Sequence, residues 1–583
     1  MPRSPARVPS PKRPASATAP ALDTCCERDL MLRILGSNKR FCDGLTRRDL
    51  LHVGALSPLG LSLAEWSRAA ERGTPASAAA GFGSAKRCIL LYLWGSPSQI
   101  DTFDTKPEAP AEVRGALGSI PTVLPGVRVG EVLPRLARML DRVTVLRSLT
   151  HPSPIHGTAF AFSAVPTTDL QLEGNVRDPR HWPFIGSVVD HLAERAVPGA
   201  PPVPRNYWLP FPFGSNRGPS RPGPYGGFLG PAYDPVWAQF RAKGTREVIR
   251  SAGGNSPTTT VADPYLGIRP ADRFDVGTTD DTLTLDRLNG RNSLLDQLDD
   301  ARRTLESRSP ATPFDRHRAL ARSVLTSGKL RDALDVQQES AALRERYGMS
   351  LFGQSCLAAR RLLEAGGKFV TVCWDEYGLV NTGWDTHIHQ VPRLKDELGP
   401  GLDAGLTALL DDLDARGMLA DTAVVVMSEH GRTPRVQNVT VGGRDPWSQA
   451  YSALFAGAGF ARGQVVGRTD RIGGTVIEVP YSPKDVVATL FHLLGIDPAG
   501  EIHDRLGRPY PIGGIGRVRP ELLGLSQLPP LLTCSRHFTW NWISITSLEP
   551  TDCSATPHQR QRAQDHQVAT GSAISAPAAC RRS

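Results

Sequence analysis

Continuous apolar runs alternate with amphipathic stretches along the central part of the chain. Five runs have the length and continuity of strands that are buried on both faces. They are CILLYLW (88–94), RVTVLRSL (142–149), KFVTVCWD (368–375), TAVVVM (422–427) and YSALFAGAGF (451–460). Three further stretches repeat apolar residues at helical spacing, at 356–367, 398–419 and 484–496. This alternation predicts an α/β domain with a mostly parallel sheet.

Two segments interrupt the α/β rhythm. Residues 200–235 are rich in Pro and Gly, which predicts a long irregular excursion over the edge of the sheet. Residues 282–347 are charged and helical in pattern, as in LLDQLDDARRTLESR and ALRERYG, and predict a helical insertion.

The 583 residues are enough for one large domain with insertions. We expect residues 79–525 to form that domain and residues 526–583 to be a disordered tail. Residues 1–30 read as a disordered extension, because a typical signal-peptide start follows at Met31. Residues 31–78 then form the signal region.

A twin-arginine pattern marks this signal region. TRRDLL (46–51) precedes the modestly apolar HVGALSPLGLSL, and an A-x-A cleavage site follows at 76–78. Gly54, Pro58 and Gly60 interrupt the apolar stretch, which is also too short to span a bilayer. The pattern predicts export to the periplasm or beyond by the twin-arginine machinery, without a stable membrane anchor. A helix cap followed by a core helix is the alternative.

The distribution of charge and the positions of the cysteines argue against some classes of function. The net charge is +9, but residues 1–30, 31–78 and 526–583 alone carry about +2, +3 and +2. The central domain is therefore nearly neutral, which argues against a nucleic-acid partner. The nine cysteines form no CxxC pair, and Cys88 and Cys373 lie in apolar runs, so we expect inert core thiols.

Polar residues cluster where the apolar runs end. The clusters are Ser98/Asp101, His151/His156, Asp385/His387, Glu429/His430 and Arg444/Asp445. Ligand sites of open parallel sheets lie at this edge, because loops and helix N-termini converge there. Carboxylates together with imidazoles suit Zn²⁺, Mn²⁺, Mg²⁺ or Ca²⁺, which would polarise a phosphoryl or sulfuryl oxygen.

Each cluster also has a structural alternative. Asp101 would serve equally well as a turn cap, and His156 could hydrogen-bond a main-chain carbonyl. Arg432 and Arg444 could hold an anion bidentately, but an Arg next to an Asp more often forms an internal salt bridge.

Several motifs occur in a characteristic order along the chain. They are LTRRDLL, LWGSPSQIDTFDTKPEAP, RSLTHPSPIHGTA, RDPRHWPFIGS, ALRERYGMSLFGQSCLAARRLLEAG, GWDTH, SEHGRTPRV and GGRDPW. In this order, from about residue 31 to 516, the chain resembles the exported bacterial family catalogued as domain of unknown function fifteen hundred and one. That family is placed in the alkaline-phosphatase and sulfatase superfamily.

The resemblance implies an alkaline-phosphatase-like three-layer sandwich with Asp101, Asp385, His387 and Glu429 near a divalent metal. It also implies that residues 151–158 hold the nucleophile. No cysteine stands there, so a formylglycine mechanism has no residue to use, and Thr158 and Ser153 are the candidates.

Two positions depart from the pattern of this family. Pro446 stands where the family usually has a histidine, so a ligand is missing. His430 stands where the family more often has an aromatic residue, and either compensates for that loss or belongs to a degenerate site.

The leading hypothesis is an exported metal-dependent hydrolase of phosphate or sulfate esters. In it, metal is held by Asp101, Asp385, His387, Glu429, His430 and Asp445. Arg432 or Arg444 grips the anionic ester or polymer, and a hydroxyl or a metal-bound water near His156 attacks. The alternative is a non-catalytic exported binding or envelope protein that keeps the fold, since fold alone does not separate the two.

Overall fold

The computed structural model describes residues 81–152, 162–163, 175–176, 178, 180–197, 203–216, 221–251, 256–276 and 313–524. The signal region, both predicted disordered termini, and Ser153, His156 and Thr158 lie outside these ranges. Within them, no helix is long and apolar enough to cross a bilayer.

A nine-stranded sheet forms the centre of the described part of the chain. Its strand order is β15-β4-β14-β11-β1-β10-β5-β6-β9. The bounds are β1 Arg87–Leu93, β4 Val143–Leu149, β5 Asn206–Leu209, β6 Val236–Phe240, β9 Phe274–Val276, β10 Phe369–Trp374, β11 Thr422–Met427, β14 Tyr451–Ala456 and β15 Gln464–Val466. β11, β1, β10, β5 and β6 are mutually parallel, whereas β14 and β9 are antiparallel to their neighbours.

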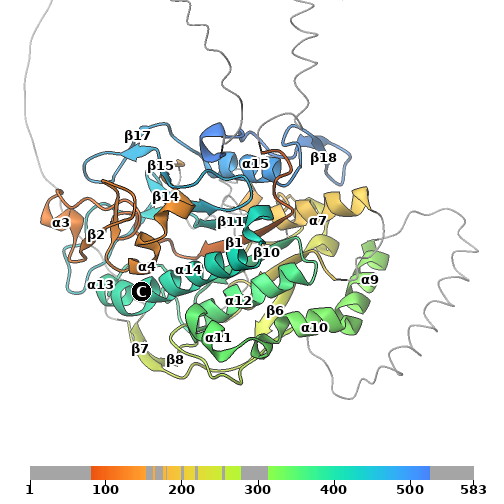
Figure 1. Cartoon of the computed structure of the whole chain (residues 1–583), viewed down its shortest axis with the longest axis horizontal. Coiled ribbons are helices and arrows are strands. Elements are labelled where there is room, and N and C mark those ends of the chain that lie inside the picture. The colour runs from red at the N-terminus through yellow and green to blue at the C-terminus, as the bar shows by residue number, and fades with distance from the viewer. Residues whose placement is uncertain are drawn as a thin grey trace, which may run out of the picture. The chain divides into compact units, whose positions relative to one another are not determined.

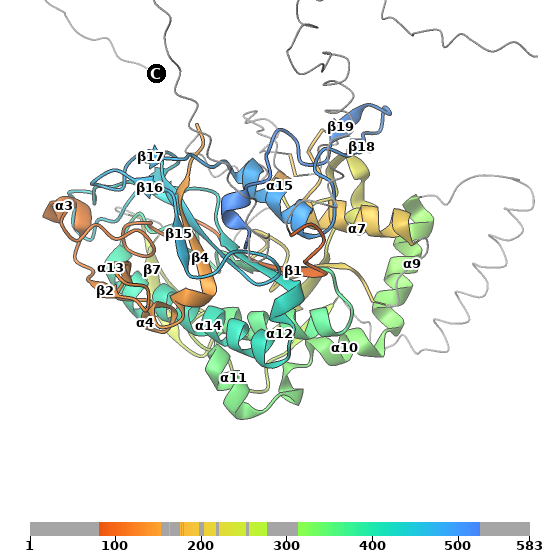
Figure 2. The same ribbon diagram turned by 45° about the horizontal axis from the view of Figure 1, so that its top comes forward.

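Helices cover both faces of this sheet. The bounds of the main helices are α7 Ile185–Ala196, α12 Leu351–Glu364, α14 Gly399–Ala415 and α15 Pro483–Leu493. Figure 2 shows α7 and α15 on one side of the strands and α12 and α14 on the other. The side chains of β1 alternate accordingly. Leu91 packs with the α12 and α14 cluster and Leu90 with the α7 and α15 cluster. The predicted three-layer α/β class is therefore confirmed.

Local sequence signals explain where the main helices begin. The Ser350 side chain caps α12 by accepting the Gly353 N–H at 3.2 Å. Ser482 and Asp485 form a capping box at the start of α15, where Pro483 is the first residue. The apolar face of α15 is buried against the sheet, as its pattern predicted.

The helical insertion is present from residue 313 onward. It comprises α9 Pro313–Thr326, α10 Gly328–Leu334 and α11 Ala341–Tyr347, which Figure 1 shows in green. Of these, α10 and α11 pack against α12. The earlier part of that prediction, residues 282–312, lies outside the described ranges.

The other strands and the short helices lie outside the nine-stranded sheet. The strands are β2 Ser119–Pro121, β3 Arg128–Gly130, β7 Glu247–Ser251, β8 Thr258–Ala262, β12 Gly431–Arg432, β13 Pro446–Trp447, β16 Arg468–Thr469, β17 Val476–Glu478, β18 Glu501–His503 and β19 Pro509–Pro511. The short helices are α3 Ala111–Arg114, α4 Pro134–Ala137 and α13 Gln390–Arg393.

One prediction was wrong in part. Residues 200–235 are not irregular throughout, because 206–209 form β5, which pairs in parallel with β10 inside the sheet. The segment NYWL is fully buried but only four residues long, between Arg205 and Pro210. The prolines on both sides of this segment made it look irregular in the sequence. It forms a strand because β10 provides its hydrogen-bonding partner.

The core cysteines behave as predicted. Cys88 and Cys373 are buried and free, on β1 and β10. Burial raises the pKa of both thiols, so neither is a thiolate at neutral pH.

Candidate functional site

Most of the candidate residues lie near the carboxyl ends of three neighbouring strands. β1, β10 and β11 are parallel and in register, so the segments after Leu93, Trp374 and Met427 emerge at one edge of the sheet. Two further loops, 381–387 and 443–446, reach the same edge. Together they bring six predicted residues into one hydrogen-bonded group, which we call the strand-end network. Its members are Asp101, Asp385, His387, Arg432, Arg444 and Asp445.

Arg444 is paired with Asp101 in the interior. Its Nε donates to Asp101 Oδ2 at 2.8 Å, and its side chain is fully buried, with Asp101 3% exposed. Arg444 Nη2 also donates to Val113 O at 2.6 Å, and the Gln390 amide donates to Asp101. The donors of this guanidinium therefore bond to acceptors inside the protein. They are not free to bind an anion with two parallel hydrogen bonds.

Arg432 holds Asp385 in a similar way. Its Nη2 contacts the Asp385 carboxylate, and the arginine side chain is fully buried. The main chain of Arg432 is held in turn by Gln99, whose side chain accepts its N–H at 2.9 Å and donates to its carbonyl at 2.8 Å. Like Arg444, Arg432 therefore lacks the exposed fork that an anion would need.

His387 bridges two carboxylates. Its Nε2 lies 3.0 Å from Asp385 Oδ1 and its Nδ1 lies 2.9 Å from Asp445 Oδ1. The hydrogen bond to Asp385 is the main reason that the pKa of His387 is raised. Since a neutral imidazole donates only one N–H, the two contacts together favour the imidazolium.

Asp445 lies at the exposed end of this chain of contacts. Burial alone would raise its pKa, but hydrogen bonds from Gln437 and His387 outweigh that effect and lower it. Its side chain is 48% exposed, so it is the part of the network most open to solvent.

Glu429 and His430 follow β11 and lie deeper. Glu429 accepts hydrogen bonds from Tyr92 Oη at 3.0 Å and from Gly95 N at 2.9 Å. His430 Nδ1 lies 2.8 Å from Gly431 O. These two residues therefore face different partners from those of His387.

The tight approach of Gly95 to Asp385 predicts a sensitive position. Gly95 has φ +91°, and a Cβ there would lie 2.2 Å from Asp385 N and 2.6 Å from Asp385 Cβ. We expect Gly95→Ala to lower the free energy of unfolding by about 1–3 kcal/mol, measured by urea denaturation. Gly417→Ala is the control, because its φ is +66° but nothing lies within 4 Å of the added methyl. Equal losses in both variants would show that the backbone angle alone matters.

A divalent metal needs several ligand side chains that converge on one point. Among the described residues, no three His, Cys, Asp or Glu side chains converge as a set of metal ligands. Asp101 and Asp385 each face a guanidinium, and both nitrogens of His387 face carboxylates. Each of these groups therefore already has a charged partner within the protein. These residues, as arranged, do not fit the predicted metal.

The nucleophile remains a sequence prediction. Ser153, His156 and Thr158 lie outside the described residues, so the placement of the predicted attacking group is untested. His151, at the start of that segment, has its Nδ1 3.2 Å from Tyr451 Oη.

Sequence reasoning missed several residues that organise the site. Gln99, Gln390 and Arg393 each hold part of it by hydrogen bonds. Asp375, directly after β10, is 1% exposed, and burial raises its pKa to about 7. Its position directly after an apolar run was the one available signal, and Glu429 holds a comparable position shortly after β11.

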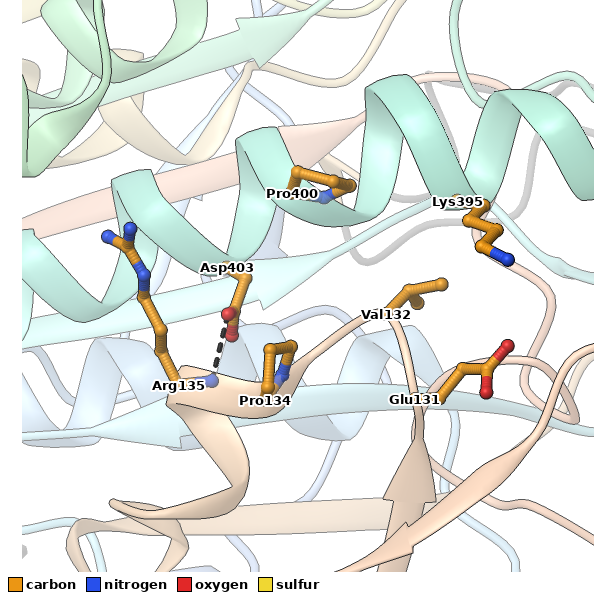
Figure 3. Close-up of a pocket in the computed structure, with 7 residues that line it drawn as sticks. All are labelled: Glu131, Val132, Pro134, Arg135, Lys395, Pro400 and Asp403. Atoms are coloured by element: carbon orange, nitrogen blue, oxygen red, sulfur yellow. Dashed lines mark hydrogen bonds between the residues drawn. The ribbon is translucent and has the colours of Figure 1, made fainter.

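A separate surface pocket of about 520 Å³ lies beside α14 (Figure 3). Glu131, Arg135 and Lys395 border it with charges of both signs. The carboxylate of Asp403 is already used, since it accepts the N–H groups of Arg135 and Leu136 at 2.8 Å. None of the residues that line this pocket belongs to the strand-end network.

Comparisons with known proteins add a family and a set of distant structures. A family described as "Protein of unknown function (DUF1501)" matches residues 85–523. No curated protein matches the chain.

Three solved structures illustrate the distant likeness. A sulfatase from Pseudoalteromonas sp. is 10% identical with a TM-score of 0.31, over 71% of this chain and 68% of that one. A phosphonate monoester hydrolase from Silicibacter pomeroyi is 10% identical with a TM-score of 0.30, over 75% and 76%. A lipoteichoic acid synthase from Listeria monocytogenes is 10% identical with a TM-score of 0.28, over 74% and 77%.

Proposed function

We propose that this chain, which belongs to the DUF1501 family of proteins of unknown function, is an exported binding protein that does not hydrolyse esters at a metal ion. One observation carries the proposal. The two aspartates at the centre of the strand-end network, Asp101 and Asp385, are each paired with a fully buried arginine. Their negative charge is therefore neutralised inside the protein.

The chemistry of the network supports the same reading. A hydrolase of anionic esters needs an electrophile or cation that can reach the substrate. Arg432 and Arg444 are fully buried and bonded to main-chain carbonyls, so neither reaches a ligand without rearrangement. The proposed role is therefore binding, and an anionic ester or polymer would have to be held by groups other than these two arginines. No nucleic acid is proposed as a partner.

Export belongs to this proposal as well. The TRRDLL segment at 46–51 and the A-x-A site at 76–78 support transport by the twin-arginine machinery to the periplasm or the outside. We propose no stable membrane anchor, because the apolar stretch after the arginines is short and interrupted by Gly and Pro.

A metal-dependent phosphate or sulfate ester hydrolase is the second candidate. It is favoured by the approach of two acidic residues to Gly95, where the Glu429 carboxylate accepts the Gly95 N–H and the main chain and Cβ of Asp385 would contact a Cβ added at Gly95. This function requires Arg432 to leave Asp385, since the guanidinium now contacts that carboxylate.

Elemental analysis and ester hydrolysis separate the two functions. The full chain, purified after export by its own route, is expected to contain less than stoichiometric divalent metal and to show no EDTA-sensitive hydrolysis of aryl sulfates, phosphates or phosphonates. Stoichiometric metal and EDTA-sensitive turnover, both lost in Asp385→Ala, would establish the hydrolase instead. Asp414→Ala is the matched control, because its carboxylate is 62% exposed and bonded only at the surface to Arg142.

A further inference from the structure

The surface pocket beside α14 lies between two segments that are distant in the sequence. Residues 131–135, which lead into α4, form one wall, and residues 395–403, where α14 begins, form the other (Figure 3). Gly399 allows their close approach, because a Cβ added there would lie 2.6 Å from Val132 Cβ. The volume of about 520 Å³ is in the range of small-molecule sites.

The wall that leads into α14 has an irregular backbone. Leu394–Leu398 form one π-helical turn, and the Gly399 N–H donates to Leu394 O, five residues back. Pro400, the next residue, has no N–H to donate to the preceding turn. Single π-helical turns are rare and are found frequently at functional sites. This turn carries Lys395, which lines the pocket.

Three charged side chains of the pocket are available to a ligand. Glu131, Arg135 and Lys395 are all exposed. Among the residues that the structure describes, neither the Glu131 carboxylate nor the Lys395 ammonium makes a hydrogen bond or an ion pair. The Arg135 guanidinium has only a 3.5 Å contact with Arg346 O. In this they differ from the two buried arginines of the strand-end network.

The available charges define what would complement them. Asp403 is excluded from this set, since its carboxylate already accepts two main-chain N–H groups. Two cations and one anion are left. Figure 3 shows the Glu131 and Lys395 side chains reaching toward each other at one end of the pocket, with the Arg135 side chain at the other end. A complementary ligand has two acidic groups and one ammonium group.

We propose that this pocket binds an acidic amino acid. One carboxylate of the ligand pairs with Arg135, whose planar guanidinium suits a carboxylate bidentately, and the other pairs with Lys395. The ligand ammonium pairs with Glu131. The inference rests on the proposed function, because it takes this chain to be a binding protein whose anionic ligand is held outside the strand-end network.

Calorimetric titration of the full chain with L-glutamate and with L-aspartate tests this inference. At least one of them is expected to bind with a Kd of about 1 mM or tighter. Glutarate and succinate are the same two compounds without the ammonium group. The dicarboxylate that corresponds to the bound amino acid should bind at least about 10-fold more weakly, because it leaves Glu131 without a partner.

Variants of the three charged residues show whether the pocket holds the ligand. Arg135→Ala and Lys395→Ala should each weaken binding by about 10-fold or more. Glu131→Gln should remove the preference for the amino acid over its dicarboxylate. Arg138→Ala is the matched control, because Arg138 is exposed and lies three residues from Arg135 but does not line the pocket. It should bind like the wild type.

The outcomes separate this inference from the proposed function. Binding of neither amino acid at about 10 mM overturns the inference. So does a Kd that is unchanged in Arg135→Ala and Lys395→Ala, or an equal loss in Arg138→Ala. Those results leave the metal content and hydrolysis of the wild type untouched. Stoichiometric metal with EDTA-sensitive turnover would overturn the proposed function, whereas binding at the pocket would still be measurable in Asp385→Ala, since Asp385 does not line it.

Discussion

Replacing Arg444 by alanine is expected to lower the free energy of unfolding by about 3–5 kcal/mol, because it leaves a buried carboxylate without its cation. Asp101 is 3% exposed, and its carboxylate would keep the hydrogen bond that the Gln390 amide donates. The variant also leaves the Val113 carbonyl, which accepts from Arg444 at 2.6 Å, without that donor. Urea denaturation at neutral pH measures the loss.

The control for this variant is an exposed ion pair of similar length. Arg468 Nη2 lies 2.6 Å from Glu478 Oε1, with the two side chains 64% and 50% exposed. Water and salt screen such a pair, so Arg468→Ala should cost less than about 1 kcal/mol. A loss in Arg444→Ala no greater than that would refute the buried-charge argument. A double variant, Arg444→Met with Asp101→Leu, should recover much of the stability, since neither charge then remains.

The strands of the fold were predictable wherever burial left a continuous apolar run. β1, β10 and β11 lie inside the sheet between other strands, so almost every residue in them is apolar. β5 escaped prediction because its four residues carry no period, and only pairing with β10 reveals it. The antiparallel direction of β14 was also hidden, since an apolar run reads the same in either orientation.

The residue types at the site were predictable, but their partners were not. Arg444 and Asp445 are neighbours in the chain, which suggests a pair. In the structure the two side chains have different partners, since Arg444 reaches Asp101 while Asp445 reaches His387. The place of an acidic residue after an apolar run predicts that its carboxylate lies at the strand ends. It does not say whether a metal or an arginine faces it, because that depends on contacts across hundreds of residues.

Asp375 is expected to make stability fall as pH rises from about 4 to about 7. Burial is the main cause of its pKa of about 7, against a model-peptide value near 4. Between these values the folded carboxyl keeps its proton while the unfolded one has lost it. The stabilisation from the protonated form is therefore complete below pH 4 and lost as the pH approaches 7. The wild type minus Asp375→Asn difference in unfolding free energy should fall by up to about 4 kcal/mol over this range.

Asp414→Asn, a change at an exposed carboxylate, should show no comparable pH dependence. A difference between wild type and Asp375→Asn that stays constant from pH 4 to 7 would mean that Asp375 ionises normally and that water reaches it.

The Asp375 carboxylate also links two segments of the chain. Asp375 Oδ2 accepts the Gly214 N–H at 2.6 Å, which ties residues 211–216 to the end of β10. Amide exchange at Gly214 should accelerate in Asp375→Ala, because that tie between the excursion and the sheet is then lost.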